Sequence, residues 1–249
     1  MKIYVVTHKK FNNKLPKDYF YMQVNAAHNE VFSELNDAVG DDNIAEKNPF
    51  YCELTASYWI WKNDKQSKIV GLAHYRRFLT TNRFSSSKKS FITSKKADKI
   101  LKKYDFIATK QYKTECTVKE HLLLNVHKKD FDLLREVVSN KYPDYIDEFD
   151  AVFSGHKSYL LNMFICKKEL WDEYYSWLFS ILSELEKLVD MTGYSIQEQR
   201  LYGFLAERLF SVYVNKNEYK VKSFPTCIVG VSKFKIGVEK IQKILHLKN

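Results

Sequence analysis

Cysteine is scarce in this chain of 249 residues, and the spacing of the few cysteines present argues against two kinds of site. They lie 50 or more positions apart, at Cys52, Cys116, Cys166 and Cys227. Zinc sites and redox motifs instead use closely spaced pairs of cysteines. We therefore expect reduced, mostly buried thiols that fill space as small hydrophobic side chains.

Long apolar runs are also missing. No stretch approaches the roughly 20 apolar residues that a membrane-spanning helix needs. The opening MKIYVVTHKK lacks the basic-then-apolar order of a secretory signal, so we expect a cytoplasmic protein. Hydrophobic residues make up 45% of the chain and aromatic residues 15%. This content allows a substantial core, and we expect one domain over residues 1–249.

Arginine is the third scarcity. The 40 basic residues outnumber the 30 acidic residues, and the formal net charge is +10. This charge favours a nucleotide, a nucleic acid or an anionic membrane surface as partner without choosing among them. Only six are arginines: Arg76, Arg77, Arg83, Arg135, Arg200 and Arg208. Because a guanidinium group binds phosphate through two hydrogen bonds and an ammonium group does not, these few cations are the more informative ones.

Strand-like and helix-like segments alternate along the chain. We expect strands at 2–7, 68–73, 106–109, 159–166 and 220–224, and helices at 53–62, 117–140, 168–188 and 196–212. Thr117 and Glu120 have the spacing of a capping box, and residues up to about 48 read as an irregular polar stretch. The alternation predicts an α/β fold with a mainly parallel central sheet flanked by helices.

The strand expected at 68–73 leads directly into His74-Tyr75-Arg76-Arg77. The carboxyl end of a strand is where open α/β sheets bind ligands. If the strand continued, His74 and Arg76 would share one face and Tyr75 and Arg77 the other. Two adjacent guanidinium groups suit a diphosphate. The alternative is a structural pair, with one arginine bonded inside the fold and the other solvated.

The helix expected at 196–212 carries a second cluster. Arg200, Phe204 and Glu207 lie at i, i+4 and i+7, so a cation and a carboxylate would project from one face. A carboxylate in a cleft can serve as a general base, and Glu207 and Glu198 are the candidates. The alternative is an ion pair on a solvated helix face.

A third cluster consists of Asp41-Asp42-Asn43 with Asn48 and Glu53. Paired acids before a helix suit a metal ion or a ribose. They also suit turns and helix caps, which is the safer interpretation.

Four blocks together resemble a known family. They are DDNIAEKNPFYCELTASYWIWKN at 41–63, GLAHYRRF at 71–78, NMFI at 162–165 and RLYGFLAERL at 200–209. In this order they are similar to the capsular polysaccharide glycosyltransferases once filed as a domain of unknown function, over about residues 2–215. The resemblance implies a GT-A-like, Rossmann-related fold, a nucleoside diphosphate sugar donor and, in some members, transfer of galactofuranose from its UDP form.

The resemblance also implies roles for residues. Thr7, His8 and Lys9 would lie near the nucleotide, and Asn162 and Met163 where related transferases contact the sugar or the acceptor. The remaining donor-binding candidates are Asp42, Asn43, Asn48, Glu53, His74, Tyr75, Arg76, Arg77, Arg200 and Arg208.

The chain departs from the general GT-A pattern at one position. Where many such enzymes carry an Asp-any-Asp metal motif, this sequence has His74-Tyr75-Arg76-Arg77. We therefore doubt that the site uses a divalent metal such as Mn²⁺ or Mg²⁺, and we assign no cofactor from the sequence. Our hypothesis is that Arg76 or Arg77 replaces the metal as counter-charge to the diphosphate.

The expected partners are a UDP-sugar donor and a lipid-linked or oligosaccharide acceptor. In the tail at 232–249, Phe234, Val238, Ile241 and Leu245 recur at helical spacing among lysines. This pattern fits a basic amphipathic helix in peripheral contact with the anionic inner membrane surface, or an ordinary terminal helix packed on the domain.

Two other functions remain open. A nucleic-acid-binding protein would explain the positive charge and the 17 tyrosines and 17 phenylalanines, but no recognisable binding signature accompanies them, and we expect no nucleic-acid partner. A non-catalytic member of the family would act as a scaffold for polysaccharide assembly.

Overall fold

The computed structural model describes residues 1–11, 14–82 and 87–229. The helix expected in the tail at 232–249 lies outside these residues. Within the described part of the chain, no helix combines the length and the apolar character needed to cross a bilayer.

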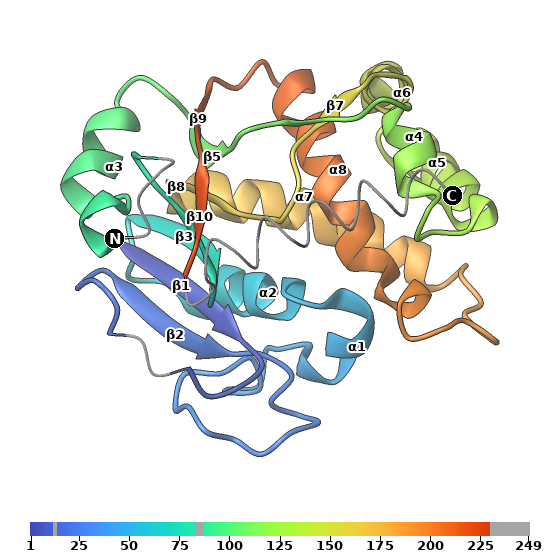
Figure 1. Cartoon of the computed structure of the whole chain (residues 1–249). Helices are drawn as coiled ribbons and strands as arrows, with labels where there is room; N and C mark the ends of the chain where they lie inside the picture. Colours follow the sequence, from blue (N-terminus) through green and yellow to red (C-terminus); the bar gives the residue numbers. More distant parts are fainter. Residues whose placement is uncertain (12–13, 83–86, 230–249) are drawn as a thin grey trace, which may run out of the picture.

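Among the described residues, eight strands form the central sheet (Figure 1). They are β1 (Lys2–Thr7), β2 (Tyr19–Gln23), β3 (Ile69–His74), β4 (Arg77–Leu79), β5 (Phe106–Thr109), β8 (Phe164–Lys167), β9 (Val221–Phe224) and β10 (Thr226–Ile228). The order is β2-β1-β3-β8-β5-β9, and β4 and β10 continue from the end of β3.

Six of these strands, β1, β2, β3, β5, β9 and β10, point in one direction, while β4 and β8 run the opposite way. The predicted α/β fold with a mainly parallel central sheet flanked by helices is thereby confirmed. The common direction brings the carboxyl ends of β1, β2, β3 and β5 to one edge of the sheet.

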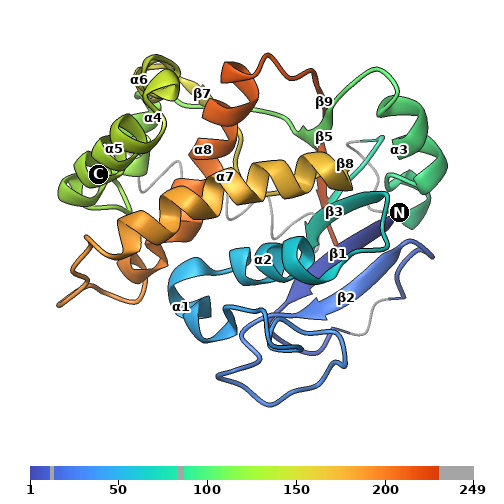
Figure 2. The ribbon, with the colours of Figure 1, turned by 180° about the vertical axis from the view of Figure 1, so that it is seen from behind.

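Helices pack around the sheet. They are α1 (Asn48–Tyr51), α2 (Leu54–Asn63), α3 (Ser94–Ile100), α4 (Val118–Leu122), α5 (Lys128–Lys141), α6 (Ile146–Ser154), α7 (Lys168–Glu186) and α8 (Leu201–Lys216). Seen from behind, α2 and α7 lie across one face of the sheet (Figure 2). The helices α4, α5 and α6 pack together beside α8, and a two-stranded ribbon of β6 (Tyr112–Lys113) and β7 (Lys157–Ser158) adjoins them.

Aromatic side chains fill the space between the sheet and α7 and α8. Phe164 on β8 stacks on Phe210 of α8 at a ring distance of 4.6 Å, and its other neighbours include Phe106 and Trp171. Each of these side chains is almost completely buried. The high aromatic content of the sequence is therefore used mainly in the core, where large rings contribute much of the buried apolar area.

The helix expected at 117–140 is broken into two. The capping box predicted at Thr117 and Glu120 is present, but α4 ends at Leu122 and α5 begins at Lys128. The buried Val126 and Phe131 lie five positions apart, which does not match the three-to-four spacing of one helix face. The break between α4 and α5 lets both side chains reach the core.

Two strand predictions also need correction. Residues 19–23, read as part of an irregular polar stretch, form β2 parallel to β1. The strand expected at 159–166 is β8, which begins only at Phe164. Leu161 and Asn162, inside the expected strand, have φ angles of 80° and 49°, a left-handed conformation that interrupts a strand.

Candidate active site

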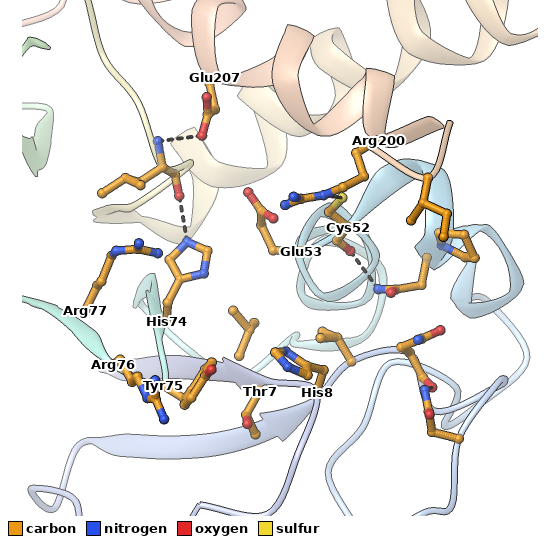
Figure 3. Close-up of a pocket in the computed structure, with 18 of the residues that line it drawn as sticks. Thr7, His8, Cys52, Glu53, His74, Tyr75, Arg76, Arg77, Arg200 and Glu207 are labelled. Carbon is orange, nitrogen blue, oxygen red and sulfur yellow. Dashed lines mark hydrogen bonds between the residues drawn. The ribbon is translucent and has the colours of Figure 1, made fainter. Parts of the chain in front are cut away.

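A pocket of about 850 Å³ opens at the carboxyl ends of β1, β2 and β3 (Figure 3). Its walls come from four places: these strand ends, the joint between α1 and α2, a turn before β8, and the start of α8. Open α/β sheets bind ligands at this edge, and the volume lies within the range of about 300–1,000 Å³ typical of ligand sites.

The segment from His74 to Arg77 forms a tight hairpin, not the continuous strand considered above. His74 ends β3 and pairs with Arg77 at the start of β4, so the chain reverses through Tyr75 and Arg76. Both arginines consequently line the same pocket. Arg77 extends beside His74, and the Arg76 guanidinium lies 5.2 Å from the centre of the Tyr75 ring (Figure 3). Both are exposed, and the described residues form no ion pair with either.

The joint between α1 and α2 supplies Cys52 and Glu53. Cys52 has a φ of 54°, and the amide of Asn48 fixes this bend by donating to the Cys52 carbonyl at 2.8 Å. Arg200, directly before α8, donates from Nε to Sγ of Cys52 at 3.3 Å. Burial raises the pKa of this thiol to about 11. The thiol is therefore protonated at neutral pH, and its contact helps to aim Arg200 into the pocket.

The turn before β8 binds two carboxylates and a histidine. The backbone N–H of Leu161 donates to Oε1 of Glu207 at 2.9 Å, and the Leu161 carbonyl lies 2.8 Å from Nε2 of His74. The Asn162 amide donates to Oε1 of Glu53 at 2.8 Å. Two consecutive left-handed residues other than glycine cost free energy. Here this strained turn, residues 161–162, holds both carboxylates of the pocket in place.

Glu207 is the titratable group most suited to chemistry. Its side chain is only 17% exposed. Burial raises its pKa from 4.5 to about 7, against the opposing effect of Arg208, and the negative charge of Glu53 adds to the rise. Arg208, which is itself buried, pairs through Nη1 with Oε2 of Glu207 and contacts Nδ1 of His121 through Nη2. A carboxyl group with a pKa near 7 can accept and release a proton at neutral pH.

Residues 2–218 match the profile of a family described as a domain of unknown function, DUF4422. The chain belongs to this family. The resemblance found in the sequence is thereby confirmed.

One solved structure is similar over nearly the whole chain. It is the apo structure of the bifunctional glycosyltransferase WbbM, with a TM-score of 0.85 and 30% sequence identity, covering 92% of this chain and 45% of that one. The chain described here therefore spans less than half of the length of WbbM. No curated protein matches the chain.

Most of the site residues expected for this family lie together. The pocket is lined by Thr7, His8, Asn48, Glu53, His74, Tyr75, Arg76, Arg77, Arg200 and Glu207. The convergence of Arg200 and Glu207 on one cleft, expected from their helical spacing, is observed, although Arg200 itself precedes α8. Their functional roles remain predictions.

Other expected site residues do not line the pocket. Glu198 accepts hydrogen bonds from Ser195 and pairs with His127 at 2.9 Å. Arg208 is buried behind Glu207, and Met163 lies in the core. These three act on the site only from outside it or not at all.

The acidic cluster at 41–43 serves the local structure. Asp42 accepts a hydrogen bond from the Tyr58 hydroxyl, and Asn43 donates to the Gly40 carbonyl. This agrees with the interpretation as turn residues. Lys9 lies beside the Tyr75 ring at 5.7 Å without lining the pocket, and Asn162 contributes through its hold on Glu53.

Sequence reasoning missed the wall that follows β2. Asn25 lines the pocket with a φ of 62°, and the described residues offer no hydrogen-bond partner to its buried Oδ1. The segment was missed because β2 itself was not recognised. An asparagine followed by small residues after an aromatic strand was the available signal, since asparagine tolerates the left-handed region.

The side chains at the pocket do not fit a divalent metal. Among the described residues, no three His, Cys, Asp or Glu side chains are grouped so as to hold an ion. The carboxylates of Glu53 and Glu207 each accept a hydrogen bond from the strained turn, and the other charges near them are arginines. Such a set of donors favours an anion over a cation.

Proposed function

We propose that the chain is a glycosyltransferase that transfers a sugar from a UDP-linked donor to a hydroxyl group of a growing polysaccharide. The observation that carries the proposal is one pocket lined by three arginines and by a largely buried carboxylate with a pKa of about 7. The family membership and the likeness to WbbM support it. Galactofuranose, indicated by the family resemblance, is the donor sugar to test first.

The arginines supply the charge that the donor needs. Arg76, Arg77 and Arg200 line the pocket, and none is neutralised by a carboxylate in an ion pair among the described residues. They would bind the diphosphate and stabilise the negative charge that develops on it as it leaves. The hypothesis that arginine replaces a metal as counter-charge thus becomes part of the proposal.

Glu207 is the proposed base. It accepts the proton of the acceptor hydroxyl while that oxygen forms a bond to the anomeric carbon of the donor. The bond from this carbon to the β-phosphate oxygen breaks, and UDP leaves with the electron pair. A single displacement of this kind inverts the anomeric configuration. The hydrogen bond from Leu161 holds the carboxylate in position before the substrate arrives.

Asn25 fits the nucleobase. Its Oδ1 has almost no exposed surface and no hydrogen-bond partner among the described residues. Leaving it unpaired costs free energy, which a ligand N–H group would recover once the side-chain amide rotates toward the pocket. The N3–H of uracil provides such a donor, and the asparagine amide nitrogen can donate to the adjacent uracil carbonyl. A side-chain amide at this position therefore supports a uridine nucleotide.

The first test is thermal unfolding of the purified protein with UDP, GDP, CMP and UDP-sugars. A ligand that binds only the native state raises its stability by mass action. We expect UDP compounds to raise the Tm selectively and the shift to persist with excess chelator. Loss of the shift in chelator, restored by manganese, would contradict the arginine hypothesis. Absence of any nucleotide effect would favour a non-catalytic scaffold.

A further inference from the structure

A second cavity lies on the other side of the strained turn. It encloses about 550 Å³ and is lined by Thr109, Lys110, Tyr112, Leu160, Pro225 and Thr226. Leu161 lines this cavity as well as the first pocket. Thr109 ends β5, which points in the same direction as β1 and β3. The two cavities therefore open at the same edge of the sheet and share one wall.

The proposed base is attached to this shared wall. The N–H that fixes Glu207 belongs to Leu161, the residue common to both cavities. In a displacement at the donor's anomeric carbon, the base must contact a hydroxyl group that reaches the donor from another side. A carboxylate at the boundary between two cavities meets this requirement when the donor occupies one and the hydroxyl-bearing molecule the other.

The chemistry of the second cavity suits a saccharide. Tyr112 is an aromatic side chain with 52% of its surface exposed, so it can stack on the C–H face of a sugar ring. Thr226 provides a hydroxyl group, whereas the buried Thr109 hydroxyl already donates to the Leu160 carbonyl at 3.3 Å. The described lining contains one charged side chain, Lys110, and no carboxylate. The cavity is thus suited to a neutral or an acidic sugar.

Tyr112 is also linked to the catalytic carboxylate. Its backbone is paired with Ser158 in the ribbon of β6 and β7, and its ring lies 5.7 Å from that of His121. His121 in turn contacts Arg208, the ion-pair partner of Glu207. The aromatic surface and the base are therefore held by one continuous set of contacts.

We propose that the second cavity binds the acceptor saccharide, with a sugar ring on Tyr112 and the reacting hydroxyl directed past Leu161 toward Glu207. This inference rests on the proposed glycosyltransferase function. The residues that it assigns to acceptor binding were not selected from the sequence. Asn162, which was selected, instead positions Glu53 through a hydrogen bond.

Binding can be measured without turnover by saturation-transfer NMR, with the methyl β-glycosides of glucose, galactose and mannose as probes at millimolar concentration. We expect at least one glycoside to receive saturation from the wild-type protein. Tyr112→Ala should reduce this signal at least fivefold, and Tyr112→Phe should retain it because the stacking face is unchanged. Lys110→Ala should reduce the signal more than Lys113→Ala, since Lys113 lies outside the cavity lining.

The control for the loss of an exposed aromatic ring is Phe20→Ala. Phe20 is 40% exposed and lies on β2, at the opposite end of the strand order from β5 and β9. It should leave the glycoside signal unchanged. Absence of glycoside binding to the wild type, or equal binding to Tyr112→Ala, would overturn the acceptor assignment.

UDP-induced stabilisation of the same variants separates the two proposals. UDP should stabilise wild type and Tyr112→Ala equally. If it does while the glycosides do not bind, the acceptor assignment fails and the transferase proposal stands. If glycosides bind through Tyr112 but UDP does not bind, the transferase proposal fails and the second cavity remains a sugar site.

Discussion

The two sides of the pocket are built in different ways. The hairpin at 74–77 presents exposed arginines that make no ion pair among the described residues. Opposite it, the strained turn and α8 hold Glu53 and Glu207 through hydrogen bonds from Asn162 and the Leu161 backbone.

This difference separates binding from chemistry. Exposed cations can adapt to a diphosphate, and they act mainly through charge. A general base must instead sit within a few tenths of an ångström of its productive position. The hydrogen bonds and the left-handed backbone are therefore concentrated where position matters most, and changes on the two sides should have distinguishable effects.

Replacing the proposed base should give the largest effect. We expect Glu207→Gln to lower kcat about 10³-fold, within the range typical of general-base catalysis. UDP binding should change little because the arginines remain. The measurement is UDP release with donor and acceptor, with UDP-induced Tm shifts as the control. If Glu207→Gln stays active while Glu53→Gln is inactive, then Glu53 is the base.

The pH profile should report the same carboxylate. Glu207 accepts a proton only when ionised, so kcat/KM should fall about tenfold per unit below its pKa of about 7 and level off above it. Glu53 raises this pKa, so any activity left in Glu53→Gln should show the fall at lower pH. A profile that is flat between pH 5 and 8 would argue against Glu207.

The raised pKa of Glu207 also makes the stability of the fold depend on pH. Because the folded protein binds this proton more tightly than the unfolded chain does, the contribution of Glu207 to stability is present below pH 4.5 and is lost as the pH rises to about 7. In Glu207→Gln this part of the pH dependence should disappear, which thermal unfolding across that range would detect.

Changes to the hairpin should weaken binding before they slow the chemistry. Arg77→Ala should lower UDP affinity about 10- to 100-fold, the value of a charge-assisted pair of hydrogen bonds. Arg135→Ala is the matched control, because Arg135 pairs with Asp150 on the outer surface. Unchanged UDP affinity in Arg77→Ala would show that this guanidinium does not contact the diphosphate.

Loosening the strained turn should have a smaller effect than replacing the base, and it should slow the chemistry without weakening donor binding. Asn162→Gly introduces a residue that also tolerates the left-handed φ. It removes the side-chain amide that donates to the Glu53 carboxylate. We expect kcat to fall about tenfold while the KM for the donor stays constant. A raised KM with constant kcat would instead place Glu53 in donor binding.

The smallest predicted effect concerns the nucleobase. Asn25→Gly likewise keeps the backbone conformation and removes one hydrogen-bonding side chain. UDP affinity should fall about five- to tenfold, as expected for loss of a single hydrogen bond of about 1 kcal/mol. The affinity for inorganic pyrophosphate should not change. Equal losses for both ligands would show that Asn25 does not recognise the base.

The sequence predicted the regular parts of this fold well. β1 and the capping box at Thr117 have strong local signals, since side-chain alternation and capping hydrogen bonds depend only on near neighbours. β2 was missed, and the strand expected at 159–166 began too early. In both places pairing with distant strands, or contacts with α8, outweighs the local preference.

The candidate site was found only in part, for a related reason. Arg200 and Glu207 were selected because their spacing on a helix is a local property. Glu198 had the same residue type and a similar position, yet Ser195 and His127 engage it away from the pocket. Residue type cannot distinguish a carboxylate held in a cleft from one bonded at the surface.

The sequence alone determined the α/β class, the family and half of the residues that line the pocket, because these follow from periodicity, from motifs read along the chain and from the family resemblance that the motifs carry. Only the tertiary structure decided that the chain reverses after His74, that Leu161 separates two cavities, and that burial raises the pKa of Glu207. Each of these depends on groups brought together from segments far apart in the sequence, and their distances and burial exist only once the chain has folded.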